Sequence, residues 1–193
     1  MIMPVTHCRL LFVKCRLANK LPAVSGLVDG DEIVQQIREV SSELVLHISA
    51  AGFHSLRARR SFTGGEVVCS FSARQDVAHP TYFSLQVDDD RHIELFPEYL
   101  QYLNHSCAPS VFLDVVRGLI IALGAIAEGD EITFFYPATE WRMTQAFECQ
   151  CRTNECLGVI RGAATLPKDV LARYTLAPHV QRKLAARNAV SKS

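Results

Sequence analysis

Apolar and polar side chains alternate over short stretches in the first half of the chain. The alternation is clear in LVLHIS (44–49) and in PTYFSLQV (80–87), and each stretch ends near glycine or aspartate residues. A period of two places successive side chains on opposite faces of a strand, so both stretches predict half-buried β-strands. Because DDDR and HIEL follow the second stretch, the pattern predicts a hairpin over residues 80–95.

Later apolar runs are short and are separated by glycine-containing turns. VVCSF follows Gly64-Gly65, and the runs VFLDVV, LIIAL and EITFFY are separated by Arg117-Gly118 and by AEGD. Helical spacing appears in FPEYLQYL (96–103), and residues 166–190 have a helix-forming composition. Many short strands with few helices predict a mainly β fold, β-rich within the α+β class and built from several small sheets.

Composition narrows the class of protein. The chain has 193 residues, and its 49% hydrophobic content is enough for the core of one domain. Twenty basic and twenty acidic side chains cancel without forming a block of one sign, so nucleic acid is not expected as a direct partner. No apolar run reaches the roughly 20 residues that a membrane-spanning helix needs, which predicts no membrane partner. Seven cysteines without a clear secretory signal favour an intracellular setting, nuclear or cytoplasmic.

Three cysteines lie close together in CQCRTNEC (149–156), where polar residues fill the gaps between them. Unligated cysteines are usually found in apolar surroundings, so this setting favours metal ligands. A structural Zn²⁺ ion takes four ligands, commonly thiolates, and Cys149, Cys151 and Cys156 would supply three of them. Spacing leaves the fourth ligand open among other cysteines and a histidine: Cys107, Cys69, Cys8, Cys15 and His105.

Three motifs in a fixed order carry a family resemblance. NHSCAPS (104–110), EGDEITFFY (128–136) and CQCRTNECLG (149–158) together resemble the SET-domain family of protein lysine methyltransferases, and GFHSLRARRSFTGGEVV (52–68) resembles the opening glycine motif of that family. The resemblance covers about residues 44–158 and implies a SET fold with a knot-like crossing of two segments. A post-SET zinc loop would follow this fold.

The resemblance also implies how the chain is divided. Residues 1–43 would form an N-terminal extension and residues 44–137 the SET domain. Residues 145–161 would form the post-SET zinc loop, and residues 162–193 a C-terminal helical tail.

Roles for single residues follow from the same resemblance. Cys107 would be the fourth zinc ligand beside Cys149, Cys151 and Cys156. Tyr136 matches the active-site tyrosine of the family, and Phe134 matches the position that tunes how many methyl groups are added. S-adenosylmethionine is the implied cofactor, and the residues expected to bind it are Gly52, Phe53, His54, Ser55, Asn104, His105, Tyr136 and Trp141.

The implied function is transfer of a methyl group from S-adenosylmethionine to a lysine side chain of a protein, which could be a histone or another protein. On a strand EITFFY, the side chains of Ile132, Phe134 and Tyr136 would share one face and form an aromatic wall. A free lysine has a pKa near ~10.4, and an apolar channel would favour the neutral amine that must attack the methyl carbon.

Two alternative functions are compatible with the same motifs. The family has two glycines where this chain has the single Gly52, which favours a zinc-stabilised SET-like binding module without methyl transfer. Only about ten residues, SARQDVAH and its neighbours, separate VVCSF from PTYFSLQV, and this short connection favours a SET-like enzyme that acts on a small molecule.

Overall fold

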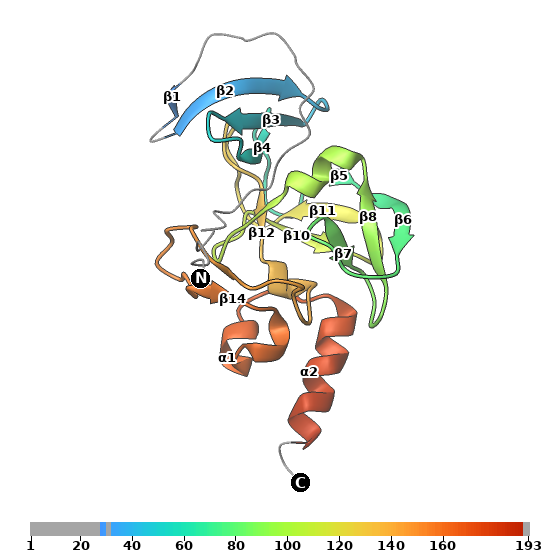
Figure 1. Cartoon of the computed structure of the whole chain (residues 1–193). Helices are drawn as coiled ribbons and strands as arrows, with labels where there is room; N and C mark the ends of the chain where they lie inside the picture. The colour runs from blue at the N-terminus through green and yellow to red at the C-terminus, as the bar shows by residue number, and fades with distance from the viewer. Residues whose placement is uncertain (1–27, 30–31, 191–193) are drawn as a thin grey trace, which may run out of the picture.

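A four-stranded antiparallel sheet forms one end of the molecule (Figure 1). The computed structural model describes residues 28–29 and 32–190, so most of the extension expected over residues 1–43 lies outside these ranges. Strand β2 falls within the segment predicted as an extension, yet it pairs with β3 from residue 34 to residue 39. The sheet has the order β1-β2-β3-β4, with bounds Val28–Asp29, Glu32–Glu39, Leu44–Ser49 and His54–Ala58.

A five-stranded sheet occupies the centre of the molecule. Its order is β5-β11-β10-β12-β9, so strands far apart in the sequence are neighbours. The strand β12 runs parallel to both of its neighbours, β10 and β9, which is how two distant segments come to lie against each other. The bounds are Val67–Ser70 for β5, Asn104–His105 for β9, Val111–Asp114 for β10, Leu119–Ala122 for β11 and Thr133–Phe134 for β12.

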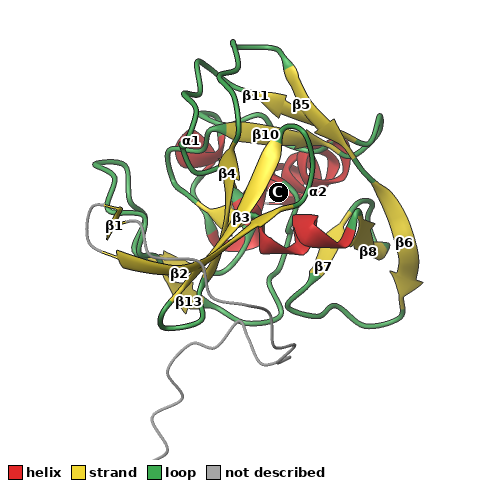
Figure 2. Cartoon of the chain, turned by 90° about the horizontal axis from the view of Figure 1, so that it is seen from above, coloured by secondary structure: helices red, strands yellow, loops and turns green. Residues whose placement is uncertain are grey.

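A third sheet contains the predicted hairpin. Strands β7 (Ser84–Gln86) and β8 (His92–Phe96) pair in antiparallel fashion, and β6 (Ser72–Val77) adds to the other edge of β8. The predicted helix after Phe96 is a short 3₁₀ helix, η1 (Glu98–Tyr102). Several small sheets with few helices confirm the predicted fold class, and Figure 2 shows the sheets from above.

The C-terminal part is mostly helical. The helices α1 (Lys168–Leu171) and α2 (Pro178–Val190) follow the 3₁₀ helix η3 (Ala163–Thr165), and the two-stranded sheet of β13 (Phe147–Glu148) and β14 (Val159–Ile160) precedes them. None of the helices within the described residues has both the length and the apolar composition to cross a membrane.

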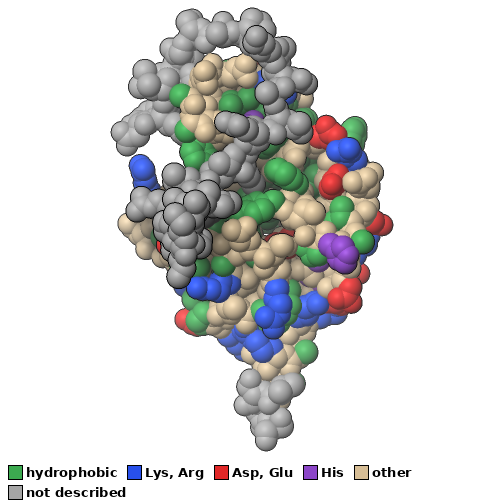
Figure 3. Space-filling model, viewed as in Figure 1, with side chains coloured by type: hydrophobic (Ala, Val, Ile, Leu, Met, Phe, Trp, Pro, Cys, Tyr) green, Lys and Arg blue, Asp and Glu red, His purple; other side chains and the backbone are tan. Residues whose placement is uncertain are grey.

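Basic side chains of α2 attach it to the rest of the fold. Lys and Arg side chains gather on the visible face where Figure 1 places the two C-terminal helices (Figure 3). Arg182 forms ion pairs with Asp88 at 2.5 Å and with Asp89 at 2.9 Å, and Arg187 donates a hydrogen bond to the carbonyl of Ala164 at 2.9 Å. The basic residues of this helix therefore have partners within the chain.

Apolar side chains are buried in two clusters. The larger cluster joins the three main sheets and contains Leu44, Leu56, Ile120 and Ile132, each with no exposed surface. The smaller cluster lies under the C-terminal helices and contains Phe135, Leu171 and Val180, among others. The boundary between the clusters passes between Phe134 and Phe135, because these adjacent rings point into different clusters.

The predicted strand EITFFY is shorter in the structure. Strand β12 ends at Phe134, and the chain enters the 3₁₀ helix η2 (Tyr136–Ala138), whose second residue is Pro137. Proline has no N–H group for a sheet and fixes its φ angle, so it favours the turn here. Phe134 and Tyr136 still approach each other with ring centroids 4.7 Å apart, whereas Ile132 is fully buried in the larger cluster. The predicted common face of three residues is therefore reduced to two.

Gly118 closes the turn between β10 and β11, and we expect Gly118→Ala to lower the free energy of unfolding by about 3 kcal/mol. Its φ angle is +67°, and a Cβ atom there would clash with the carbonyl oxygen of Phe71. As a control, Gly129→Ala has a comparable φ of +90° but no heavy atom within 4 Å of the new Cβ, so it should cost about 1 kcal/mol. Urea unfolding measures the free energy of unfolding of both variants, and an equal loss of stability in the two would show that the Cβ atom at position 118 causes no clash.

Candidate functional site

Two segments cross at the centre of the site. Asn104 and His105 on β9 lie beside Thr133 and Phe134 on β12 in parallel register. The backbone N–H of Ser106 adds a hydrogen bond to the carbonyl of Phe134 at 3.1 Å. These main-chain contacts hold the NHSC motif against the TFFY motif, as the knot-like crossing predicted from the resemblance requires.

Asn104 joins this crossing to the loop predicted to contact the cofactor. Its side-chain amide donates one hydrogen bond to the carbonyl of His54 at 2.8 Å and another to the carboxylate of Glu131, also at 2.8 Å. The ring of His54 stacks on that of Tyr102, with ring centroids 4.3 Å apart. The structure therefore brings His54 and Asn104 together, although 50 positions separate them in the sequence.

In the turn before His54, two backbone N–H groups donate hydrogen bonds within the turn itself. The N–H of Gly52 donates to the carbonyl of Ser49 at 2.9 Å, and that of Phe53 donates to the hydroxyl of Ser49 at 3.1 Å. Gly52 has a φ of +82°, a value that favours glycine, and Phe53 is 47% exposed. Ser55 lies on β4, opposite His47. Because the N–H groups of Gly52 and Phe53 already have partners, this turn could contact a ligand only through its side chains and its remaining carbonyl groups.

The His105 side chain connects the tyrosine backbone to a cysteine. Its Nδ1 atom accepts a hydrogen bond from the N–H of Tyr136 at 3.2 Å, and its Nε2 atom lies 3.4 Å from the sulfur of Cys107. Burial lowers the pKa of His105 to about 4, so the ring is neutral near pH 7. Because Nδ1 accepts, Nε2 carries the proton and donates toward the sulfur.

Tyr136 is fixed by both its backbone and its side chain. The phenol donates a hydrogen bond to the carbonyl of Leu103 at 2.8 Å, which orients the hydroxyl group. Burial raises the pKa of Tyr136, and the nearby carboxylates of Glu131 and Glu140 raise it further. The hydroxyl is therefore protonated at neutral pH and acts as a polar group in apolar surroundings.

Tyr136 lies in the wall of a small hollow of about 90 Å³. The lining comes from four parts of the chain: β7 with the segment before it, Leu95 on β8, the helix η1 with the residue after it, and the segment from β12 to β13. Apolar and aromatic side chains predominate, and Glu140 is the one carboxyl among the described residues that line it. The aromatic members of the lining are Tyr82, Phe83, Phe134, Tyr136 and Phe147.

Aromatic rings also surround the crossing next to this hollow. The ring centroids of His105, Tyr136 and Phe147 lie 5.2 to 5.9 Å from one another. Faces of aromatic rings attract cations, and a sulfonium group is a cation, so this ring cluster fits the methyl donor of the resemblance.

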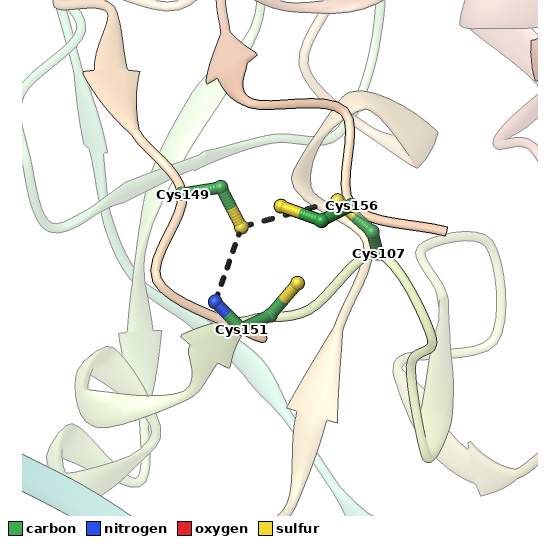
Figure 4. Close-up of side chains that lie close together, drawn as sticks. All are labelled: Cys107, Cys149, Cys151 and Cys156. Carbon is green, nitrogen blue, oxygen red and sulfur yellow. Dashed lines mark hydrogen bonds between the residues drawn. The ribbon is translucent and has the colours of Figure 1, made fainter. Parts of the chain in front are cut away.

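Four cysteine side chains point toward one centre (Figure 4). The sulfur atoms of Cys107, Cys149, Cys151 and Cys156 all lie within 4.8 Å of one another, and those of Cys107 and Cys149 are 3.9 Å apart. Four thiolates at about 2.3 Å from a Zn²⁺ ion would be about 3.8 Å apart, so the donor set fits zinc. Backbone N–H groups of Leu157 and Cys151 point at two of these sulfurs, as is suitable for thiolates.

The structure separates the alternatives for the fourth ligand. Cys107 lies in the cluster, and Cys69 packs against the larger apolar cluster, where burial raises its pKa to about 12. His105 contacts the sulfur of Cys107 and is not part of the four-residue group. Cys8 and Cys15 lie outside the described residues.

Trp141, another predicted cofactor residue, lies against the C-terminal helices; of the residues predicted to bind the cofactor, Tyr136 alone lines the hollow. The backbone N–H of Trp141 donates to the side-chain oxygen of Gln86 at 2.9 Å, and the backbone carbonyl of Trp141 accepts from the N–H of Ala164 at 2.9 Å. These bonds hold its ring against the smaller apolar cluster, where the guanidinium of Arg187 lies 5.8 Å from the ring centroid.

Two residues of the site were not predicted from the sequence. Phe147 stands two positions before Cys149, and an aromatic residue at the start of a metal loop was a usable signal. Glu140 is a single acid in a loop, and such a residue has no sequence pattern that separates it from a solvated one.

Comparisons with known proteins agree with the geometry. Residues 54–137 match the SET domain. The chain is 38% identical to methyltransferase flvH of Aspergillus flavus over 137 residues, which are 69% of this chain and 75% of that protein. It is also 31% identical to histone-lysine N-methyltransferase ash1 of Drosophila melanogaster over 78 residues, which are 37% of this chain and 4% of that protein.

Proposed function

This chain belongs to the SET-domain family of methyltransferases, and from that premise we propose that it transfers a methyl group from S-adenosylmethionine to a lysine side-chain amine of a protein. The observation that carries the proposal is the oriented phenol of Tyr136 in the wall of an apolar hollow, next to the crossing of the NHSC and TFFY motifs. Histones and other proteins are both candidate substrates. One relative, ash1, is named as a histone-lysine methyltransferase.

The residues of the hollow can align an amine and exclude water. When bound, S-adenosylmethionine supplies a methyl group activated by its positive sulfur. Catalysis then depends mainly on alignment, because an amine displaces the sulfur along one line. The Tyr136 oxygen can accept a hydrogen bond from the amine while its own O–H group continues to donate to the carbonyl of Leu103. Phe134 narrows the hollow beside Tyr136, which would limit how many methyl groups the amine can carry.

The residues proposed to hold the cofactor are His54, Ser55, Asn104, His105 and Tyr136, with Gly52 and Phe53 in the adjoining turn. Their support is the contact between His54 and Asn104 and the ring cluster around His105. Phe147 is added to this set, because it contacts both His105 and Tyr136, and Trp141 stays a proposed member from the resemblance alone.

A small-molecule amine is the second candidate substrate. Two observations favour it: the hollow is only about 90 Å³, and the relative that matches over 75% of its length is named simply as a methyltransferase. Incubation of the purified chain with radiolabelled S-adenosylmethionine and separate pools of histones, ribosomal proteins and small amines tests both candidates. Label in a protein band supports the lysine assignment, and label confined to the small amines supports the second candidate.

A binding module without methyl transfer is tested by cofactor binding. Isothermal titration with S-adenosylmethionine should give one site per chain if the enzyme assignment holds. Absence of any binding, in a protein that is folded by circular dichroism and has its metal, would leave the module as the remaining function.

A further inference from the structure

Glu140 is a mostly buried acid that has no part in the mechanism described above. It follows η2, and its backbone N–H donates to the carbonyl of Tyr136 at 2.9 Å, so its place is tied to that of the tyrosine. Its Oε1 atom accepts a hydrogen bond from the N–H of Gln86 on β7 at 2.8 Å. The side chain is 13% exposed and lines the same hollow as Tyr136.

Within the described part of the chain, no cationic side chain pairs with this carboxyl group. Among the described residues no lysine or arginine forms an ion pair with Glu140, and the closest basic atom is Nε2 of His92, 3.9 Å from Oε2. That distance is too long for a hydrogen bond, and this buried nitrogen has no hydrogen-bond partner in the described part of the chain. Burial lowers the pKa of His92, so its ring is neutral at pH 7.

A carboxylate removed from water needs a proton or a cationic partner, because burial alone strongly disfavours its charge. Burial raises the pKa of Glu140 to about 7, although hydrogen bonds from Gln86 and Thr139 act in the opposite direction. The group can therefore change its charge near neutral pH.

We propose that Glu140 recognises the substrate amine: its carboxylate binds the ammonium form as it enters the hollow and then takes one proton from it. This inference rests on the proposed function, because it assigns the substrate of that hollow to the class of primary or secondary amines on an apolar stem. The aromatic and aliphatic lining would contact the stem.

The proton balance is simple. An N–H bond of the ammonium breaks and an O–H bond forms on Glu140, which leaves a neutral amine and a neutral carboxyl group. A dry hollow favours this exchange, because burial lowers the pKa of an amine and raises that of a carboxyl group. After methyl transfer the product nitrogen is positive again, and the proton on Glu140 passes to water, which accounts for the one proton released by the reaction.

The test compares binding of Nα-acetyl-lysine methylamide with that of its norleucine analogue, which has the same backbone but no amine. The full-length chain is titrated with each compound and followed by NMR. Wild-type protein should prefer the lysine compound at least tenfold at pH 8, and Glu140→Gln should lose this preference while the norleucine compound binds as before. Glu128→Gln removes an exposed carboxylate outside the hollow and should behave as wild type.

The pH dependence gives a second readout that a purely structural role would not produce. Lysine stays cationic from pH 6 to pH 8, whereas Glu140 ionises in this range, so the preference for lysine should rise by roughly tenfold. The titratable groups around Glu140 are His92, Tyr136, Tyr82 and, behind Thr139, His179. Burial lowers the pKa values of His92 and His179 and raises that of Tyr136.

The outcomes separate this inference from the proposed function. A lysine preference that persists in Glu140→Gln overturns the role of Glu140, even if the enzyme methylates lysine. Failure of wild-type protein to bind the lysine compound overturns it as well. A preference that depends on Glu140 in a protein with no methyl transfer supports the amine site and contradicts the enzyme assignment alone.

Discussion

Replacing Cys107 with serine is expected to release the metal and to lower the free energy of unfolding by about 4 kcal/mol or more. Cys107 is 2% exposed and is the one member of the cysteine cluster from the NHSC motif, so it ties the late loop to the centre of the fold. Tyr174 donates a hydrogen bond to the carbonyl of Cys107 at 2.8 Å, and its ring stacks on Phe135. Loss of the metal should therefore loosen the C-terminal helices too.

Metal analysis by mass spectrometry should find about one zinc ion per wild-type chain and none in Cys107→Ser. Cys151→Ser should also lose the metal, because it removes another ligand of the same group. Cys69→Ser is the control: Cys69 is a half-buried thiol outside the cluster, and its variant should keep its zinc. Unchanged zinc in Cys107→Ser would show that the four sulfurs do not form the site.

Replacing Tyr136 with phenylalanine is expected to reduce kcat by about 10²–10³-fold while the fold is kept. The variant loses the hydroxyl that the Leu103 carbonyl orients in the hollow, but keeps the ring that packs on Phe134 and Phe147. One hydrogen bond to a backbone carbonyl is removed, so stability should fall by only about 1 kcal/mol. Initial rates of methyl transfer and a urea unfolding curve measure the two effects.

Tyr99→Phe serves as the matched control, because Tyr99 is a half-buried tyrosine that does not line the hollow. Its rate should stay within about twofold of wild type. If Tyr136→Phe transfers methyl groups at the wild-type rate, the assignment of the active-site tyrosine is incorrect, although the family membership would stand.

Local patterns were sufficient for much of the fold. The alternation in LVLHIS predicted β3, and PTYFSLQV with HIEL predicted the β7–β8 hairpin. Alternation reports a half-buried strand reliably, because one face must pack and the other meets solvent. The same reasoning made the strand EITFFY too long, because it did not include the effect of Pro137 on the backbone.

Part of the candidate site could also be predicted from local patterns, and part of it depended on the tertiary structure. The spacing of Cys149, Cys151 and Cys156 indicated three ligands of one metal, and motif resemblance added Cys107. Trp141 was assigned to the cofactor by its distance from Tyr136 along the chain, and that role stays a prediction. In the structure its backbone contacts with Gln86 and Ala164 place its ring against the C-terminal cluster. Distance along a chain does not determine which cluster a side chain joins.

The sequence by itself therefore determined the class of fold, the family and the local cluster of three cysteines, because these depend on residue types at short, fixed spacings. Tertiary structure alone decided which distant groups meet: Asn104 with His54, His105 with both Tyr136 and Cys107, and Glu140 with the hollow. The physical reason is that a buried polar group needs hydrogen-bond partners. The parallel pairing of β9 with β12 and the turn at η2 determine which segments of the chain lie close enough to provide them.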